Sequence, residues 1–131
     1  TIIRESDLIT LHLPLTKNTK NLITYKDLMK MKKDAIIINT SRGGIVNESD
    51  LHRALSEGHL SGAAIDVFER EPYDGDLKNI EKCILTSHMG SMSIDCRIKM
   101  EIEATEEAVR LITGKPLVGL VPEEEYALRN S

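Results

Sequence analysis

The feature that most constrains the fold is the apolar run AIIIN at residues 35–39. Three consecutive isoleucines over the length of a strand are typical of a parallel strand that is buried on both faces. Neighbouring parallel strands must be joined by a crossover connection, which is usually a helix. We therefore expect strands and helices to alternate along this chain.

The rest of the sequence follows that alternation. Short apolar runs predict further strands at residues 7–13, 62–68 and 83–86, and capped apolar stripes predict helices at residues 24–33, 47–58 and 93–113. A proline-containing acidic segment at residues 69–81 is expected to be a loop. This order predicts an α/β fold with right-handed crossovers, namely the carboxyl-terminal half of a doubly wound, Rossmann-like parallel sheet.

Composition narrows the classes of function. The chain has 131 residues, enough for one domain or part of one, with a net charge of −4 and only 3% aromatic residues. A basic patch and a base-stacking platform are both absent, so nucleic acid is a poor candidate partner. No apolar stretch approaches the roughly 20 residues that span a bilayer, so we expect no membrane association. The chain begins at Thr1 and shows no secretory signal, so we expect it to be either a fragment or a naturally short protein.

The two cysteines have no metal-binding spacing. Cys83 and Cys96 stand thirteen residues apart, without a CxxC pair or a histidine cluster beside them. We therefore predict two reduced thiols, no metal site and a cytoplasmic location.

Chemically useful side chains follow the predicted strands. In an open parallel sheet, ligands bind in the crevice outside the carboxyl ends of the strands. Arg42 follows the isoleucine strand, Asp66 lies near the end of the next one, Glu71 comes a few residues later, and His88 follows the last strand. Together they supply one guanidinium, two carboxylates and one imidazole. These groups could bind an α-keto acid and transfer a proton to it.

Three of these residues also have a simpler interpretation. Arg42 could be a solvated arginine at a strand end, and Glu71 could only solvate an acidic loop. Asp66 could cap the following turn or accept a hydrogen bond from a cofactor amide. The physics of the sequence alone leaves these alternatives open.

Four segments together resemble a known family: SDLITLHLPLTKNTKNLI, MKKDAIIINTSRGGIVNESDL, GHLSGAAIDVFEREP and ILTSHMGSMS. Their order and spacing, over about residues 6–116, are similar to the NAD-binding domain of D-isomer-specific 2-hydroxyacid dehydrogenases, of the phosphoglycerate dehydrogenase type. The resemblance implies an oxidoreductase that uses NAD, with NADP not excluded, and acts on a small 2-hydroxy or 2-keto acid. It also implies a homodimer formed through this domain.

The resemblance assigns roles residue by residue. It implies that Arg42 holds the substrate carboxylate and carbonyl, that His88 exchanges the proton, and that Glu71 supports His88. The cofactor contacts that it implies are Leu13, Thr19, Thr40, Ser41, Arg42, Asp66, His88, Gly90 and Ser91.

The sequence departs from the family pattern at several points. The family often has aspartate at the position of Asn47 and proline at that of Ser87, and we expect both changes to be structural. No GxGxxG phosphate loop occurs. We therefore expect residues 1–116 to be the carboxyl-terminal part of an NAD-binding domain. Residues 117–131 would be an acidic tail, possibly returning to a missing substrate domain.

With only part of the cofactor cradle, the isolated chain should bind dinucleotide poorly and be nearly inactive. The main alternative function is a non-catalytic NAD-binding scaffold or a corepressor-like protein of the same fold. A hydrolase of the adenosylhomocysteine type fits less well, because it does not share the order of Arg42, Glu71 and His88. Which 2-hydroxy acid is the substrate stays open.

Overall fold

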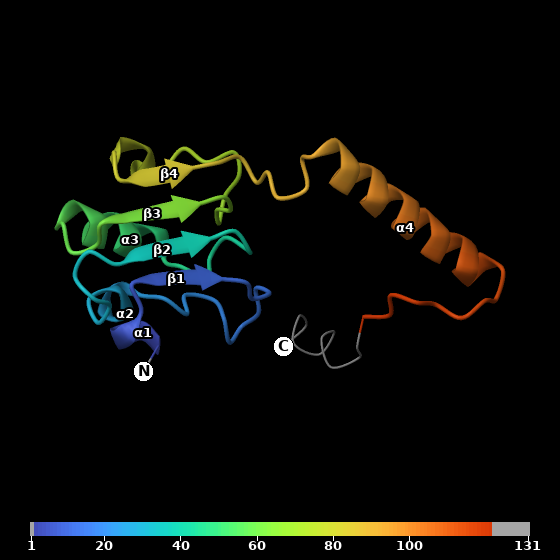
Figure 1. Cartoon of the computed structure of the whole chain (residues 1–131), viewed down its shortest axis with the longest axis horizontal. Helices are drawn as coiled ribbons and strands as arrows, with labels where there is room; N and C mark the ends of the chain where they lie inside the picture. The colour runs from blue at the N-terminus through green and yellow to red at the C-terminus, as the bar shows by residue number, and fades with distance from the viewer. Residues whose placement is uncertain (1, 122–131) are drawn as a thin grey trace. The chain divides into compact units, whose positions relative to one another are not determined.

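A computed structural model describes residues 2–121, which fall into two compact units that divide between His88 and Met89. The first unit contains a four-stranded sheet in the order β1 (Leu8–Leu11), β2 (Ile36–Asn39), β3 (Gly62–Ile65) and β4 (Cys83–Leu85). All neighbouring strands are parallel, and the arrows in Figure 1 point toward the same edge. The predicted α/β parallel sheet is confirmed.

Helix α1 (Ile2–Glu5) precedes β1. Helices α2 (Tyr25–Leu28) and α3 (Glu48–Ser56) and a 3₁₀ turn, η1 (Asp76–Asn79), connect the four strands. The apolar side chains of α2, α3 and η1 pack with the strands into one core, where Leu28, Leu51 and Leu77 are almost completely buried. Gly58 has a φ of +71° just beyond α3. It ends that helix in the left-handed conformation expected from its position in the sequence.

Three element boundaries differ from the sequence prediction. Helix α2 is a single turn and not a helix of ten residues, because from Lys30 onward the backbone bonds are of the i→i−3 type. Strand β3 ends at Ile65, three residues before the expected end at Phe68. The expected loop at residues 69–81 contains η1, whose Leu77 anchors it in the core.

The expectation that β2 is buried on both faces is wrong for this chain. Ile37 and Asn39 are buried, whereas Ile36 is 38% exposed and Ile38 is half-buried. The same alternation occurs in β1, where Leu8 is exposed and Ile9 is buried. The reason is that side chains alternate between the two faces of a strand, and only one face of the described sheet is covered.

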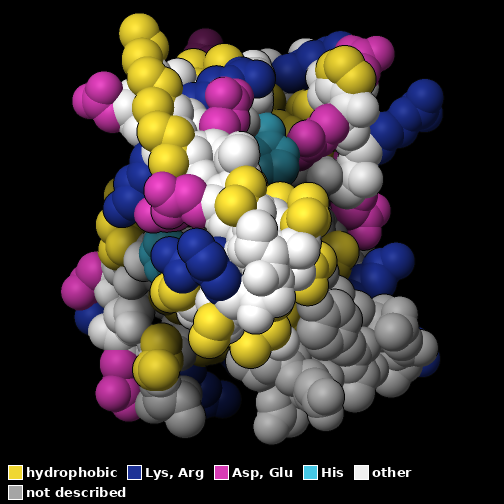
Figure 2. All heavy atoms as spheres, turned by 90° about the vertical axis from the view of Figure 1, so that its right-hand side faces the viewer, with side chains coloured by type: hydrophobic (Ala, Val, Ile, Leu, Met, Phe, Trp, Pro, Cys, Tyr) yellow, Lys and Arg dark blue, Asp and Glu magenta, His cyan; other side chains and the backbone are white. Residues whose placement is uncertain are grey.

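The second unit contains α4 (Ile94–Ile112), close to the predicted helix at residues 93–113. The Ser93 side chain accepts a hydrogen bond from the Cys96 backbone N–H, and Gly114 follows the helix with a φ of +67°. No residue of α4 is buried. Hydrophobic side chains also lie uncovered among charged ones on the face shown in Figure 2.

Two further sequence expectations concern the acidic tail and a membrane-spanning helix. The acidic cluster of the predicted tail, residues 123–125, lies outside the described residues. Among residues 2–121, no helix combines the length and the apolar character needed to cross a membrane.

Candidate active site

The site begins with the register of the sheet. Leu11 pairs with Asn39, Asn39 with Ile65, and Ile65 with Leu85, so the last residues of all four strands lie in one row. The segments that carry Arg42, Asp66 and His88 therefore leave the sheet along one edge. This is the edge at which open parallel sheets bind ligands.

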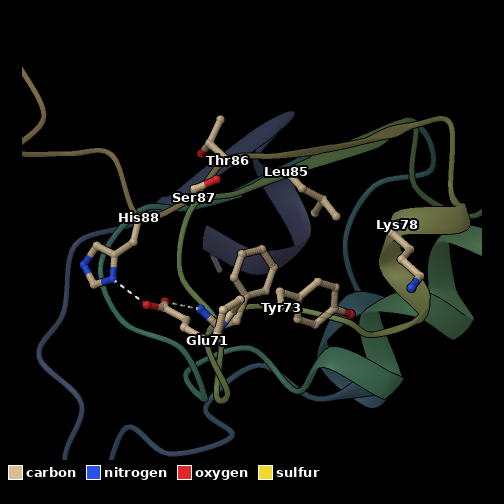
Figure 3. A pocket seen from close by; sticks show the side chains of 9 residues that line it. Glu71, Tyr73, Lys78, Leu85, Thr86, Ser87 and His88 are labelled. Carbon is tan, nitrogen blue, oxygen red and sulfur yellow. Dashed lines mark hydrogen bonds and ion pairs between the residues drawn. The ribbon is translucent and has the colours of Figure 1, made fainter.

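Glu71 and His88 form the most direct contact at this edge. The Oε2 atom of Glu71 lies 3.0 Å from Nδ1 of His88, and its Oε1 atom accepts the Phe68 backbone N–H at 3.0 Å. Figure 3 shows the Glu71 carboxylate between these two partners. One carboxylate thus orients the imidazole while the turn after β3 holds that carboxylate.

Electrostatics and backbone geometry both single out this pair. The hydrogen bond from His88, followed by the one from the Phe68 backbone, lowers the pKa of Glu71 below its usual value. His88 has a φ of +54°, an uncommon conformation for a residue that is not glycine. Its backbone N–H donates to the Asp66 carbonyl at 2.8 Å, so the unusual conformation is fixed at the end of β3.

Arg42 lines the same pocket as Glu71 and His88. A pocket of about 480 Å³ is lined by Arg42, Glu71 and His88, together with Leu15, Lys20, Gly43, Gly44, Phe68 and Glu69. The Arg42 side chain is exposed, and its Nη1 donates to the Ser41 carbonyl at 2.6 Å. Among the described residues, no carboxylate forms an ion pair with Arg42, so its guanidinium is available to an anionic ligand.

A second pocket, of about 550 Å³, shares Phe68, Glu71 and His88 with the first. It is lined by Tyr73, Lys78, Leu85 and Thr86 among others, and the Tyr73 ring stacks on Phe68 with their centroids 4.1 Å apart. His88 therefore borders two adjoining spaces.

The structure shows why glycine is required at both positions after Arg42. We expected Gly43 and Gly44 to let a ligand approach and the chain turn. At Gly43, a Cβ atom would lie 2.0 Å from the carbonyl carbon and oxygen of Phe68, so it is protein backbone that approaches closely. Gly44 has a φ of +79°, which makes the sharp turn.

Five residues expected to contact the cofactor surround the strand ends in the first unit. Leu13 is 40% exposed just after β1, and Thr40 is exposed just after β2. The Ser41 hydroxyl donates to the Asn39 side chain. The Thr19 hydroxyl donates to the Pro14 carbonyl at 2.7 Å, so it braces the turn that follows β1. Asp66 is buried, and its carboxylate accepts a hydrogen bond from the Thr86 hydroxyl.

The remaining candidates fall outside this group. Gly90 and Ser91, also expected at the cofactor, belong to the second unit. Cys83 and Cys96 are free thiols, and burial raises the pKa of Cys83 to about 11. Within the described part of the chain, no group of histidine, cysteine and acidic side chains is arranged to hold a metal ion.

Sequence reasoning missed Asn39 as a residue of the site. This side chain is 2% exposed and makes hydrogen bonds to the segment that carries Arg42. The available signal was a single polar residue at the end of an otherwise apolar strand, directly before TSRGG. A buried polar side chain needs hydrogen-bond partners, and here the following turn supplies them.

Comparison with known proteins identifies a family that matches most of this chain. Residues 1–90 match the family described as D-isomer specific 2-hydroxyacid dehydrogenase, NAD binding domain. A glyoxylate reductase of Aeropyrum pernix is 40% identical over 130 residues, which cover 98% of this chain and 39% of the relative. A D-3-phosphoglycerate dehydrogenase of Bacillus subtilis is 37% identical over 121 residues, which cover 92% of this chain and 23% of the relative.

A solved structure agrees with the sequence matches. The crystal structure of a glyoxylate reductase from Paecilomyes thermophila superposes with a TM-score of 0.89 and 33% identity, covering 94% of this chain and 38% of that one. The chain thus spans well under half the length of the proteins that it resembles.

Proposed function

Because the chain belongs to the D-isomer specific 2-hydroxyacid dehydrogenase family through its NAD binding domain, we propose that it forms the carboxyl-terminal part of the cofactor domain of an oxidoreductase. The reaction is the reversible conversion of a 2-keto acid to a D-2-hydroxy acid. The observation that carries this proposal is that Arg42, Glu71 and His88 line one pocket at the carboxyl edge of the sheet.

The residues present fit the nicotinamide end of the cofactor. The Thr40–Arg42 segment and the buried carboxylate of Asp66 lie at adjacent strand ends, where they can contact the nicotinamide ring and its amide. When bound, the cofactor would donate a hydride to the substrate carbon in its reduced form and accept one in its oxidised form. The GxGxxG loop that would hold the pyrophosphate does not occur in these 131 residues.

The chain's own side chains would perform the remaining steps. Arg42 binds the substrate carboxylate through two parallel N–H groups and polarises the neighbouring carbonyl oxygen. His88 donates a proton to that oxygen during reduction and takes it back during oxidation. Its Nδ1 is engaged by Glu71, so Nε2 is the ring nitrogen that faces substrate. Glu71 holds the ring in place through the hydrogen bond between its Oε2 and the His88 Nδ1.

The domain assignment is part of the same proposal. Residues 1–116 would form the carboxyl-terminal part of the cofactor domain, and residues 117–131 would be a tail that connects it to a substrate domain. The open face of the sheet supports this, because Leu8 and Ile84 are 49% and 67% exposed, as expected if further elements of a doubly wound fold cover them.

The assembly and location are proposed on separate observations. We assign a homodimer formed through this domain, with α4 as the candidate contact, because its large apolar side chains Ile98 and Leu111 are exposed. A cytoplasmic location is supported by the two free thiols.

The deciding experiment is Arg42→Lys in the full-length protein that contains this chain. It is assayed with NADH and NADPH against a panel of 2-keto acids. Lysine cannot form the bidentate contact, and a loss of roughly 1.5–3 kcal/mol corresponds to a fall in kcat/KM of about 10- to 150-fold. Arg70→Lys is the matched control, because Arg70 is exposed in the neighbouring loop and does not line the pocket.

Two results would contradict the proposal. Equal activity of Arg42→Lys and the wild type would remove Arg42 from the site. Binding of NADH by a full-length wild-type protein that reduces no 2-keto acid would favour the non-catalytic scaffold instead.

A further inference from the structure

We propose that Asn39 is the positioning residue that sets the geometry of the Arg42 loop, residues 40–44, and thereby the orientation of substrate. The inference rests on the proposed function, in which Arg42 holds the substrate carboxylate. Asn39 is the last residue of β2, and it lies in the sheet with a side chain that is 2% exposed. A buried amide is costly unless its polar atoms are satisfied, and every partner that the structure gives this side chain lies in the loop.

Three hydrogen bonds join the Asn39 side chain to the loop. Its Nδ2 donates to the Arg42 carbonyl at 2.9 Å. Its Oδ1 accepts from the Ser41 backbone N–H at 3.2 Å and from the Ser41 hydroxyl at 2.9 Å. One planar amide therefore holds two successive residues of the loop, and it uses both its donor end and its acceptor end to do so.

The other side of Asn39 is fixed by the sheet. Its backbone pairs with Leu11 on β1 and Ile65 on β3, and its carbonyl accepts the Asp66 N–H at 3.0 Å. The side chain thus transfers the rigidity of the central strands to a segment that has no regular secondary structure of its own. Pre-organised binding groups matter because a displacement of about 1 Å can cost two orders of magnitude in rate.

Asparagine suits this position through its chemistry and its length. Aspartate has the same shape, but its second oxygen would face the Arg42 carbonyl oxygen in place of a donor. Leucine has the same branching at Cγ but would leave the Ser41 and Arg42 groups without their partners. The loop therefore requires a side chain of this length that donates a hydrogen bond to the Arg42 carbonyl and accepts hydrogen bonds from Ser41.

Asn39→Asp tests the inference with a pH profile. At pH 8 the carboxylate opposes the Arg42 carbonyl, and we expect kcat/KM for 2-keto acid reduction in the full-length protein to fall by at least about tenfold. A protonated carboxyl can donate to that carbonyl, and burial favours protonation. The ratio of variant to wild-type activity should therefore recover to within about threefold near pH 5.5. Arg42 and Asp66 are the titratable residues whose backbones bond to Asn39, and both are present in the variant and the wild type. Dividing the variant activity by the wild-type activity at each pH therefore cancels their contribution to the pH profile.

The control is Asn79→Asp, an exposed asparagine at the end of η1 that undergoes the same change of charge. It should keep wild-type activity at both pH values. A loss at Asn39→Asp that does not recover at low pH would overturn the inference, because a general packing defect does not depend on protonation.

A measurement on the wild-type chain keeps the inference testable if the variant does not fold or the full-length protein is inactive. By NMR, the side-chain amide protons of Asn39 should exchange with solvent at least about tenfold more slowly than those of exposed Asn79. Equal exchange would overturn the positioning role. Slow exchange together with an inactive wild-type protein would instead count against the proposed function alone.

Discussion

At the scale of single residues, the Glu71–His88 contact gives a signed pH dependence. The pKa of Glu71 is lowered in the folded chain, so its contact stabilises the fold fully above the ordinary carboxyl pKa of roughly 4.3. That stabilisation is lost as the pH falls through the lowered value. Glu71 and His88 side chains are 38% and 48% exposed, so solvent screens the pair and its contribution stays below about 1 kcal/mol.

Glu71→Gln tests this sign. Chemical denaturation should show the variant less stable than the wild type by a small, constant difference above about pH 5, which shrinks below about pH 4. Glu81→Gln is the control, because Glu81 is exposed and forms no ion pair in the described structure. A difference that grows toward low pH would mean that Glu71 is destabilising as a carboxylate, contrary to its two hydrogen bonds.

Gly43→Ala should affect the site through the backbone. The added Cβ would lie 2.0 Å from the Phe68 carbonyl group, and main-chain atoms cannot rotate away as a flexible side chain can. We expect a loss of about 1–3 kcal/mol in the free energy of unfolding, measured by denaturant titration. Gly119→Ala, where no atom lies within 4 Å of the new methyl group, should change stability by less than about 0.5 kcal/mol. Equal effects at the two positions would contradict the close approach at Gly43.

The predictability of the site differs from residue to residue. Arg42 and His88 could be nominated because they directly follow strands of a parallel sheet, whose carboxyl ends converge. Glu71 could not be separated from other surface carboxylates by pattern alone, because its contact with His88 depends on the path of the turn after β3. Asn39 escaped notice since its importance comes from three bonds to a loop whose conformation the sequence does not specify.

At the scale of elements, the start of α3 depends on one cap. The Asn47 Oδ1 accepts the Asp50 backbone N–H at 3.0 Å and the Ser49 hydroxyl at 2.7 Å. Asn47→Ala should lower the free energy of unfolding by about 1 kcal/mol, whereas Asn47→Asp should stay within a few tenths, because a carboxylate also caps and suits the helix dipole. Thermal or chemical unfolding of the two variants checks this, and a matching loss in both would show that the Asn47 amide, not its oxygen, is what matters.

Elements with strong local signals were predicted well. Helix α3 has an asparagine cap, a stripe that includes Leu51 and Leu55, and a terminal glycine, and it forms where expected. The shortness of α2 and the presence of η1 could not be read locally. Both depend on the packing of single leucines, Leu28 and Leu77, into a core that the whole first unit builds.

At the scale of the whole molecule, the alternation of apolar runs and helices predicted the parallel sheet, but it did not predict how far the sheet is buried. The AIIIN run predicts two covered faces, yet Ile36 is exposed. A sequence records the environment for which its residues were selected, and that environment includes any neighbouring segment that covers the second face. The apolar side chains on the uncovered face of the sheet therefore support the proposal that this chain belongs to a larger domain.

The glycine-rich phosphate loop determines how tightly a doubly wound fold binds a dinucleotide. Most of the recognition of NAD's pyrophosphate in doubly wound folds comes from a glycine-rich loop at a helix N-terminus, and these 131 residues contain no GxGxxG. We expect the isolated chain to bind NADH more weakly than about 100 μM, which limits the binding free energy to about −5.5 kcal/mol. Isothermal titration calorimetry with NADH measures this directly, and micromolar affinity would show that the chain holds a complete cradle.

NMR titration of the isolated chain separates the two ends of the cofactor. Nicotinamide mononucleotide should shift the backbone amide signals of Thr40, Arg42 and Asp66, which follow β2 and β3 at the carboxyl edge of the sheet. Adenosine monophosphate should leave them unchanged, because the adenine end of the dinucleotide binds to the other mononucleotide-binding half of a doubly wound sheet. Equal shifts with both nucleotides would indicate nonspecific anion binding at Arg42, whereas a selective response to nicotinamide would locate the reactive end of the cofactor beside His88.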